Sequence, residues 1–312
     1  MLDIKKYKIL LNVVDQGNLT KASGNLGYTQ PAITHMMKGI EREIGIPILK
    51  RSNKGIQLTS EGRDVLPLIR EIVNANERLY QRCAMLRGLE TGRIRVGCFP
   101  TVACAWLPKI IRQFERRYPE IQIELLEESS LSRLEEWLSA GVADICFFSR
   151  QPGRTYKWFP MMEDPFYAIL PVGHPLASYD RIPVAKLQDQ PFLMCRSKDG
   201  PDTDIGRYLK QNHVSLRLKF SSSQDYTIIC MVKEGLGISM LPWSLMRSAF
   251  QTQLREFEVR LLDPPAFRNL GMAVRSDEEI SPAMDRFIKC VMSMLPELTD
   301  FEESFGKAER CQ

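Results

Sequence analysis

The first 45 residues contain three short runs in which apolar side chains recur at steps of three and four, the spacing of one face of an amphipathic helix. Gly17-Asn18 ends the first run and Gly27-Tyr28 ends the second, so each helix is limited to a few turns. Thr29 can cap the third run, Pro31 suits its first turn, and Gly45 ends it. Two short helices joined by a turn of about four residues form a helix-turn-helix, whose second helix enters the major groove of DNA.

A basic hairpin is predicted directly after these helices. The segment Ile46–Leu58 alternates polar and apolar residues and turns at Asn53-Lys54-Gly55, with Lys50 and Arg51 close to the turn. Such a hairpin, called a wing, lies along the DNA phosphates, where its positive charge displaces counterions.

The positive charge of the chain is concentrated in this N-terminal head. Residues 1–60 hold nine Lys and Arg against four Asp and Glu, a net charge of +5, whereas the whole chain of 312 residues carries +4. A basic head on a near-neutral body is typical of a nucleic-acid-binding module joined to a part that need not contact nucleic acid. Charge alone would equally fit a solvated basic face, but the order of helices and hairpin favours DNA binding.

A long helical stretch follows from Thr59 to about Leu89. Its apolar positions step by four and three, and one Asn falls on the same line, as in a two-stranded coiled coil whose register is fixed by a lone polar residue. We expect this helix to pair two copies of the chain through Val65, Ile69, Ile72, Asn76, Leu79, Cys83 and Leu86. The alternative is a helix packed on its own domain, since Pro67 must loosen its early turns.

Beyond Gly88–Gly92 strand-like and helix-like segments alternate, which predicts a parallel, doubly wound α/β sheet. The first set of alternating segments is Arg93–Cys98, Cys104–Arg117, Ile121–Leu126, Leu131–Ala140 and Asp144–Phe148. The second set is Phe166–Pro171, Pro191–Cys195, Thr203–Gln211, Leu216–Phe220, Gln224–Glu234 and Gly237–Leu241. One more strand, Leu270–Arg275, and a last helix, Pro282–Leu295, complete two α/β lobes.

The motifs of the common enzyme classes are missing from the sequence. Gly235-Leu236-Gly237 lacks the third glycine of a dinucleotide-binding loop and precedes a strand instead of following one. The sequence holds no GxSxG motif, no P-loop and no SxxK constellation. We therefore expect a protein that is not an enzyme and needs no cofactor.

Eight cysteines without any Cys-x-x-Cys pair, and three widely separated histidines, argue against a disulfide framework and a metal site. Cys195 and Cys230 could form a redox pair, although buried, inert thiols are the simpler interpretation. No uncharged run reaches the ~18 apolar residues of a membrane span, and no signal-peptide cleavage site follows the first helix. We expect a cytoplasmic protein without membrane association.

Hydroxyl side chains follow or precede predicted elements at three places where open α/β sheets bind ligands. They are Pro100-Thr101-Val102, Ser129-Ser130 and Ser222-Ser223. Ordinary helix capping explains any one of them, and only their convergence favours a pocket. Arg196 and Lys198, just past a strand end, suggest an anionic ligand.

Several motifs match one protein family. Thr29-Gln30-Pro31-Ala32-Ile33-Thr34 corresponds to a Ser-Gln-Pro-Ala-x-Ser core, Ile40-Glu41 to a Leu-Glu pair, and Ile48-Leu49-Lys50-Arg51 to Leu-Phe-x-Arg. The body matches more loosely, for example at Glu234-Gly235-Leu236-Gly237 with Leu241-Pro242. Together these motifs resemble the LysR-type transcriptional regulator family over almost the whole length of the chain.

The resemblance implies an α/β protein with an all-α, winged-helix N-terminal domain. Residues 1–59 would form the winged helix-turn-helix, 60–90 the linker and dimerisation helix, and 91–300 a two-lobed α/β effector domain similar to periplasmic binding proteins. Lobe I would span about 91–162 and 269–300, lobe II about 163–268, and residues 301–312 would be a tail. The implied partners are double-stranded DNA, a small-molecule effector, RNA polymerase, and further copies of the chain in a homodimer or homotetramer.

The same resemblance assigns the expected site residues. Those that would contact DNA are Thr20, Thr29, Gln30, Pro31, Thr34, His35, Lys38, Arg51 and Lys54. Those that would line the effector cleft are Pro100, Thr101, Val102, Ser129, Ser130, Phe148, Ser149, Arg196 and Thr203. The expected function is sequence-specific regulation of transcription under the control of an effector, and the alternative is a redox-sensing regulator that uses Cys195 or Cys230.

Overall fold

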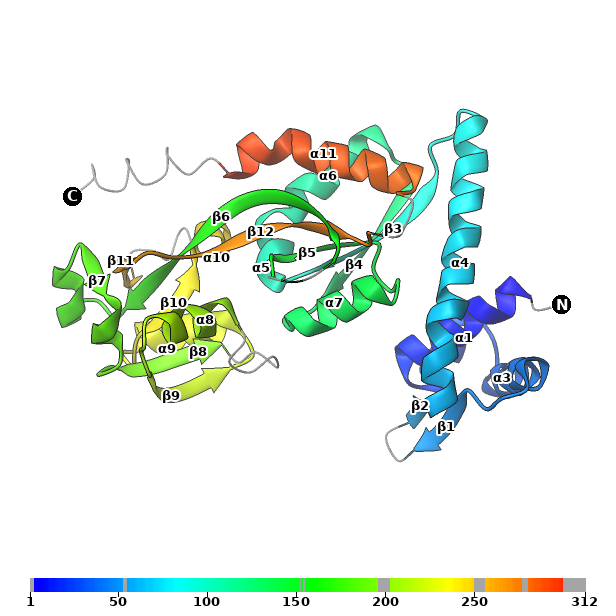
Figure 1. Cartoon of the computed structure of the whole chain (residues 1–312), viewed down its shortest axis with the longest axis horizontal. Helices are drawn as coiled ribbons and strands as arrows, with labels where there is room; N and C mark the ends of the chain where they lie inside the picture. Colours follow the sequence, from blue (N-terminus) through cyan, green and yellow to red (C-terminus); the bar gives the residue numbers. More distant parts are fainter. Residues whose placement is uncertain are drawn as a thin grey trace. The chain divides into compact units, whose positions relative to one another are not determined.

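Figure 1 shows the chain as a computed structural model that describes residues 3–52, 55–151, 153, 155–195, 203–249, 256–276 and 280–299. The chain forms two compact units. The first comprises Met1–Gly92 with Ser139–Val142, and the second comprises Arg93–Leu138 and the chain from Ala143 onward.

The head at the start of the first unit has the order that the sequence predicts. It consists of α1 (Ile4–Gln16), α2 (Leu19–Leu26), α3 (Gln30–Ile44), β1 (Leu49–Ser52) and β2 (Gly55–Leu58). Gly17 and Gly27 adopt the left-handed conformation just after α1 and α2, where a side chain would be strained. Thr29 caps α3, because its hydroxyl accepts a hydrogen bond from the amide of Ala32. The fully buried core of the head contains Leu10, Val13, Ala22, Ile33, Ile40 and Ile48.

Two contacts fix the wing, β1 and β2, against the helices. The amide after Gly55 donates to the carbonyl oxygen of Gly17 at 2.9 Å, and a Cβ on Gly55 would lie only 2.5 Å from that oxygen. On the other side, the Glu41 carboxylate of α3 accepts from the amides of Ile48 and Leu49 at 2.8 and 2.9 Å. The wing therefore depends on a glycine and on one carboxylate.

The first turns of α4 (Ser60–Leu86) pack on the head of the same chain. Ile69 is only 4% exposed, Val65 is half-buried against the same core, and Arg70 forms an ion pair with Asp15 at 2.8 Å. The expectation that Ile69 faces a second copy of the chain is therefore wrong, because the core of the head already buries it, while Val65 is only partly covered by the same core. The helix continues through Pro67, which lies inside it.

The later part of α4 presents its apolar residues to solvent. Ile72, Leu79 and Leu86 are 46, 60 and 76% exposed, Cys83 is also exposed, and Asn76 is half-buried. These five positions of the predicted seam remain available for pairing with a second copy of the chain.

The second unit contains four clusters of buried apolar residues, two in each of two lobes. The first lobe consists of β3 (Gly92–Cys98), α5 (Pro100–Ala105), α6 (Leu107–Arg117), β4 (Ile121–Glu127), α7 (Leu131–Ser139), β5 (Ile145–Ser149) and α11 (Pro282–Thr299). The second lobe consists of η1 (Pro175–Ser178), β7 (Arg181–Pro183), η2 (Val184–Leu187), β8 (Pro191–Cys195), α8 (Asp204–Gln211), β9 (Arg217–Ser222), α9 (Asp225–Lys233), β10 (Ser239–Pro242), α10 (Trp243–Ala249) and β11 (Glu258–Asp263).

Two long antiparallel strands, β6 (Lys157–Leu170) and β12 (Ala266–Val274), run through both lobes (Figure 1). On β6, Met161 belongs to the core of the first lobe and Phe166 to that of the second. On β12, Leu270 and Ala266 divide in the same way. Any change in the angle between the lobes must therefore bend these two strands.

The sheet is mixed, and this differs from the parallel sheet that the alternation of segments predicts. β3 and β5 are parallel, but β12 is antiparallel to both β5 and β6, and the strand order is β4-β3-β5-β12-β6-β11-β7 with β10 on β6. β8 and β9 form a separate parallel pair. Alternation alone does not reveal that β12 returns from the second lobe to the first.

Some elements differ from those predicted. The segment Cys104–Arg117 contains the end of α5 and all of α6 instead of one helix, since the chain leaves the helical backbone at Trp106, two residues before Pro108. Proline has no amide hydrogen with which to continue a preceding helix. Five short elements, η1, β7, η2, α10 and β11, lie in segments for which no element was predicted.

Candidate DNA-reading helix and effector cavity

The predicted DNA-contacting side chains gather at the start of α3 and on α2. Gln30, Pro31, His35 and Lys38 are exposed on α3, as are Thr29 before it and Thr20 on α2. Ile33 and Met37, between them, point into the core. This division places the polar side chains on the outer face of α3.

Gln30 is held by a neighbour from the preceding helix. The Thr20 hydroxyl donates to Oε1 of Gln30 at 3.4 Å, while the half-buried Thr34 donates its hydroxyl to the Gln30 carbonyl oxygen at 2.9 Å. The side-chain amide nitrogen of Gln30 remains a donor, and Oε1 keeps a second lone pair. Arg51 is in β1, although its side chain, like the whole of Lys54, lies outside the described residues.

A cavity of about 450 Å³ lies in the second unit, between elements of both lobes. Its wall includes the ends or starts of α5, α7, β5, β8, α8 and α9, together with strand residues of β6, β10 and β12. The lining residues are Phe99, Pro100, Thr101, Glu127, Glu128, Ser129, Leu131, Ser149, Phe166, Cys195, Thr203, Asp204, Ile205, Ser223, Gln224, Asp225, Met240, Leu241, Pro242 and Arg268. A volume of this size suits a small organic molecule.

The structure brings together five of the residues expected in the cleft, namely Pro100, Thr101, Ser129, Ser149 and Thr203. Three others face away from it. Val102 packs in the core of the first lobe, Phe148 contacts the rings of Tyr156 and Trp158, and the buried Ser130 hydroxyl accepts from the amide of Arg133. Side chains alternate between faces of a strand and turn about 100° per helical residue, so neighbours of a cavity residue are directed elsewhere. Arg196 lies outside the described residues.

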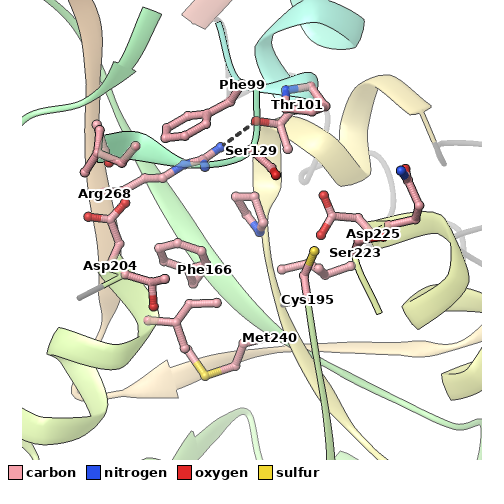
Figure 2. Close-up of a pocket in the computed structure, with 18 of the residues that line it drawn as sticks. Phe99, Thr101, Ser129, Phe166, Cys195, Asp204, Ser223, Asp225, Met240 and Arg268 are labelled. Atoms are coloured by element: carbon pink, nitrogen blue, oxygen red, sulfur yellow. Dashed lines mark hydrogen bonds between the residues drawn. The ribbon is translucent and has the colours of Figure 1, made fainter. Parts of the chain in front are cut away.

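Arg268 is the basic residue among the described lining, and sequence reasoning missed it. It is 8% exposed and pairs with the fully buried Asp164, its strand neighbour on β6, at 2.9 Å. Nη2 also donates to the Thr101 hydroxyl at 3.3 Å, as Figure 2 shows, and to that of Ser244 on α10 at 3.4 Å. One guanidinium therefore joins both lobes at the strands that connect them. A charged residue among mostly apolar neighbours was the available signal.

The start of α7, where Ser129-Ser130 suggested a ligand-binding end, is occupied by a carboxylate of the chain itself. Oε1 of Glu128 accepts from the amides of Ser129 and Ser130 at 2.9 and 3.1 Å. An anionic ligand would have to displace this carboxylate to reach those amides. The hydroxyl of Ser129 is directed toward the cavity in Figure 2.

Cys195 and Asp225 form a pair on the opposite side of the cavity from Arg268 (Figure 2). The Cys195 thiol donates to the Asp225 carboxylate, and burial together with this negative neighbour raises the pKa of Cys195 to about 12. Burial also raises the pKa of Asp225, against the opposing effects of the thiol and of Arg268. Cys195 is therefore held as a neutral thiol at neutral pH, and thiols react more slowly with oxidants than thiolates.

Cys230, the second predicted redox candidate, is half-buried on α9 and does not line the cavity. Within the described residues, no group of three or more His, Cys, Asp or Glu is placed to hold a metal ion. No helix among them is both long and apolar enough to cross a membrane.

Two family models match the chain, and together they cover nearly all of it. One, described as "Bacterial regulatory helix-turn-helix protein, lysR family", matches residues 4–63. The other, described as "LysR substrate binding domain", matches residues 87–296.

Curated relatives carry regulator names. The uncharacterized HTH-type transcriptional regulator YvbU of Bacillus subtilis is 30% identical over 289 residues, which cover 92% of this chain and 97% of YvbU. The HTH-type transcriptional activator CmpR of Synechocystis is 26% identical over 241 residues, covering 76% and 78% of the two chains.

Solved structures share the fold. A full-length OxyR variant from Pseudomonas aeruginosa superposes with a TM-score of 0.70 at 22% identity, covering 95% of this chain and 98% of that one. The effector-binding domain of QuiR in complex with shikimate has a TM-score of 0.57 at 18% identity and covers 66% of this chain and 98% of that one.

Proposed function

The chain belongs to the LysR family of DNA-binding transcription regulators with an effector-binding domain, and we propose how its own residues carry out that role. The start of α3 reads operator DNA, with Gln30 at a base edge and Lys38 near a phosphate. A small molecule in the cavity changes the angle between the two lobes, and this change alters how the paired heads meet the operator.

The observation that supports this proposal is the position of Arg268. It lines the cavity and, through Thr101 and Ser244, contacts both lobes at the point where β6 and β12 connect them. A ligand that binds one lobe arrangement more tightly than another shifts the equilibrium between them by that difference in affinity. A ligand in a cavity within one lobe would not contact both lobes and so would not favour one lobe arrangement over another.

The remaining partners belong to the same proposal. The chain pairs as a homodimer through Ile72, Asn76, Leu79, Cys83 and Leu86 of α4, and two dimers can assemble into a homotetramer. It acts in the cytoplasm, where a regulator meets its operator, contacts RNA polymerase there, and catalyses no reaction. The effector carries an anionic group, for which Thr101 and Arg268 supply donors.

The alternative function is a redox sensor that uses Cys195 or Cys230. The place of Cys195 in the cavity wall favours it, and its raised pKa opposes it. Mild peroxide followed by mapping of modified thiols separates the two functions. We expect neither cysteine to oxidise before the protein unfolds, whereas early oxidation of either one with a change in operator binding would establish the redox function.

Footprinting tests the main proposal. The full chain is bound to the DNA upstream of its own gene, with and without a panel of small carboxylates and amino acids. We expect an interrupted palindrome to be protected, and the protected length to change with at least one compound. Absence of any protected site would contradict the DNA-reading role of α3.

A further inference from the structure

The charged residues of the cavity wall differ in how the protein compensates them. Asp204 pairs with Arg207 of its own helix, Glu128 accepts two backbone amides, and Arg268 is neutralised by a carboxylate on β6. Asp225 has no such partner, because no described Lys, Arg or His forms an ion pair with it. Among the described residues, two carboxylates of the cavity wall, Asp225 and Glu127, have no such compensation, and of these two only Asp225 is half-buried.

Asp225 is placed to meet a ligand. It lies in the first turn of α9, lines the cavity, and directs its carboxylate toward the interior beside the sulfur of Cys195 (Figure 2). The side chain that donates a hydrogen bond to Asp225 is the Cys195 thiol, which is a weak donor. Arg268 acts on it only through space, and that guanidinium is already shared between Asp164 and two hydroxyls.

A partly buried carboxylate without a countercharge is costly, and a cationic donor that binds beside it recovers that cost. We propose that the effector carries a protonated amine that binds Asp225, in addition to an anionic group near Thr101 and Arg268. The proposal rests on the effector-controlled function above and adds a chemical class, a zwitterion whose amine meets the Asp225 carboxylate and whose anionic group accepts hydrogen bonds from Thr101 and Arg268. Arg268 and Asp225 lie on opposite sides of it in Figure 2.

Matched probes of one chain length test this directly. Binding of 4-aminobutyrate, butylamine and butyrate to the full-length protein is measured by titration calorimetry at pH 8. The amino acid, the amine and the carboxylate with six-carbon chains are then compared in the same way. We expect both amine-bearing probes of a length to bind, and the amino acid to bind about tenfold more tightly than the carboxylate alone.

Two variants assign the effect to one residue. Asp225→Asn keeps the shape and an acceptor for the Cys195 thiol, and we expect it to weaken the amine-bearing probes about tenfold while butyrate changes less than about twofold. Glu234→Gln removes one negative charge at the exposed end of the same helix, outside the cavity, and should bind every probe as the unmodified protein does. Equal operator affinity of both variants without a probe shows that they are folded.

Three results would overturn the proposal. In the first, Asp225→Asn leaves the affinity for the amine-bearing probes unchanged. In the second, butyrate and its six-carbon analogue bind as tightly as the amino acids of the same length. In the third, no amine-bearing probe binds at about 10 mM. In the second case effector control of the cavity still stands with an anionic ligand. In the third case the operator footprint, which does not depend on these probes, decides separately whether the regulator function holds.

Discussion

At the scale of single residues, Asp225 links ligand binding to stability. Burial raises its pKa in the folded chain above the ordinary value of an aspartate. Such a carboxyl contributes stability below its ordinary pKa, and this contribution is lost as the pH rises through the raised pKa. Above that raised pKa the empty protein therefore holds a destabilising charge that a cationic ligand would relieve.

The first prediction follows from this loss of stability with rising pH. Without ligand, Asp225→Asn should raise the melting temperature at pH 8, and the gain should shrink to nothing as the pH falls and the aspartate becomes protonated. Scanning calorimetry from pH 8 down to pH 4 measures both. A variant that is less stable at pH 8, or a gain that does not depend on pH, would contradict the account of this residue.

A second prediction concerns base reading by Gln30, whose side chain Thr20 holds at the start of α3. Gln30→Ala should remove discrimination at one base position, at a cost of about 1–3 kcal/mol. Binding to a set of operators changed one base pair at a time measures this. If the variant lost equal affinity for operator and random DNA, Gln30 would be no more than a general contact.

Lys54 supplies the contrasting prediction, made from the sequence of the wing. Lys54→Ala should weaken binding to all DNA sequences alike and lower the slope of log affinity against log salt by about one. Affinities measured between 50 and 200 mM salt provide that slope. A change in base preference with an unaltered slope would contradict the phosphate-contact role.

At the scale of elements, the wing depends on Glu41. Its carboxylate accepts hydrogen bonds from the amides of Ile48 and Leu49, which lie at the start of the hairpin. Glu41→Ala should destabilise the head by about 2 kcal/mol, because a hydrogen bond to a charged group contributes about 1.5–3 kcal/mol, while Glu41→Gln should lose less since its amide oxygen still accepts. Urea unfolding of the full chain, followed at the head, tests the order of the two variants. Equal loss in both would show that the hydrogen bonds are not the cause.

The sequence predicts most elements because their ends carry local signals. Gly17, Gly27 and Thr29 mark helix boundaries that the structure shows at the same places. The cavity wall was harder to predict, because Arg268 and Asp164 meet only through the pairing of β12 with β6, 104 residues apart in the chain. The prediction that Phe148 lines the cavity was wrong for a simpler reason. Its neighbour Ser149 lines the cavity, and successive side chains of a strand point to opposite faces.

The linker helix shows the same division within one element. Apolar residues spaced four and three apart predict an apolar stripe along the helix, but they do not predict which surface covers it. The head buries Ile69 and partly covers Val65, whereas Leu79 and Leu86 stay exposed. A local period thus identifies the buried face of a helix and leaves open whether its own chain or a second copy buries it.

At the scale of the whole molecule, the exposed stripe of α4 predicts assembly. Leu79→Lys should convert dimers to monomers at micromolar concentration, since it places like charges where two apolar side chains would meet. Glu71→Lys, on an exposed polar position of the same helix, is the matched control and should remain dimeric. Sedimentation equilibrium distinguishes them. A Leu79→Lys chain that stays dimeric would place the interface elsewhere.

In the proposed function, the cavity and the operator are coupled through the two lobes. Coupling of equilibrium affinities is reciprocal, so the factor by which a compound changes operator affinity must equal the factor by which the operator changes affinity for the compound. The most direct measurement is therefore titration of one compound that alters the footprint, with and without saturating operator DNA. We expect the compound to bind with two different affinities, in the ratio that the DNA titrations give. Identical affinities with and without the operator would show that the cavity and the operator are not coupled.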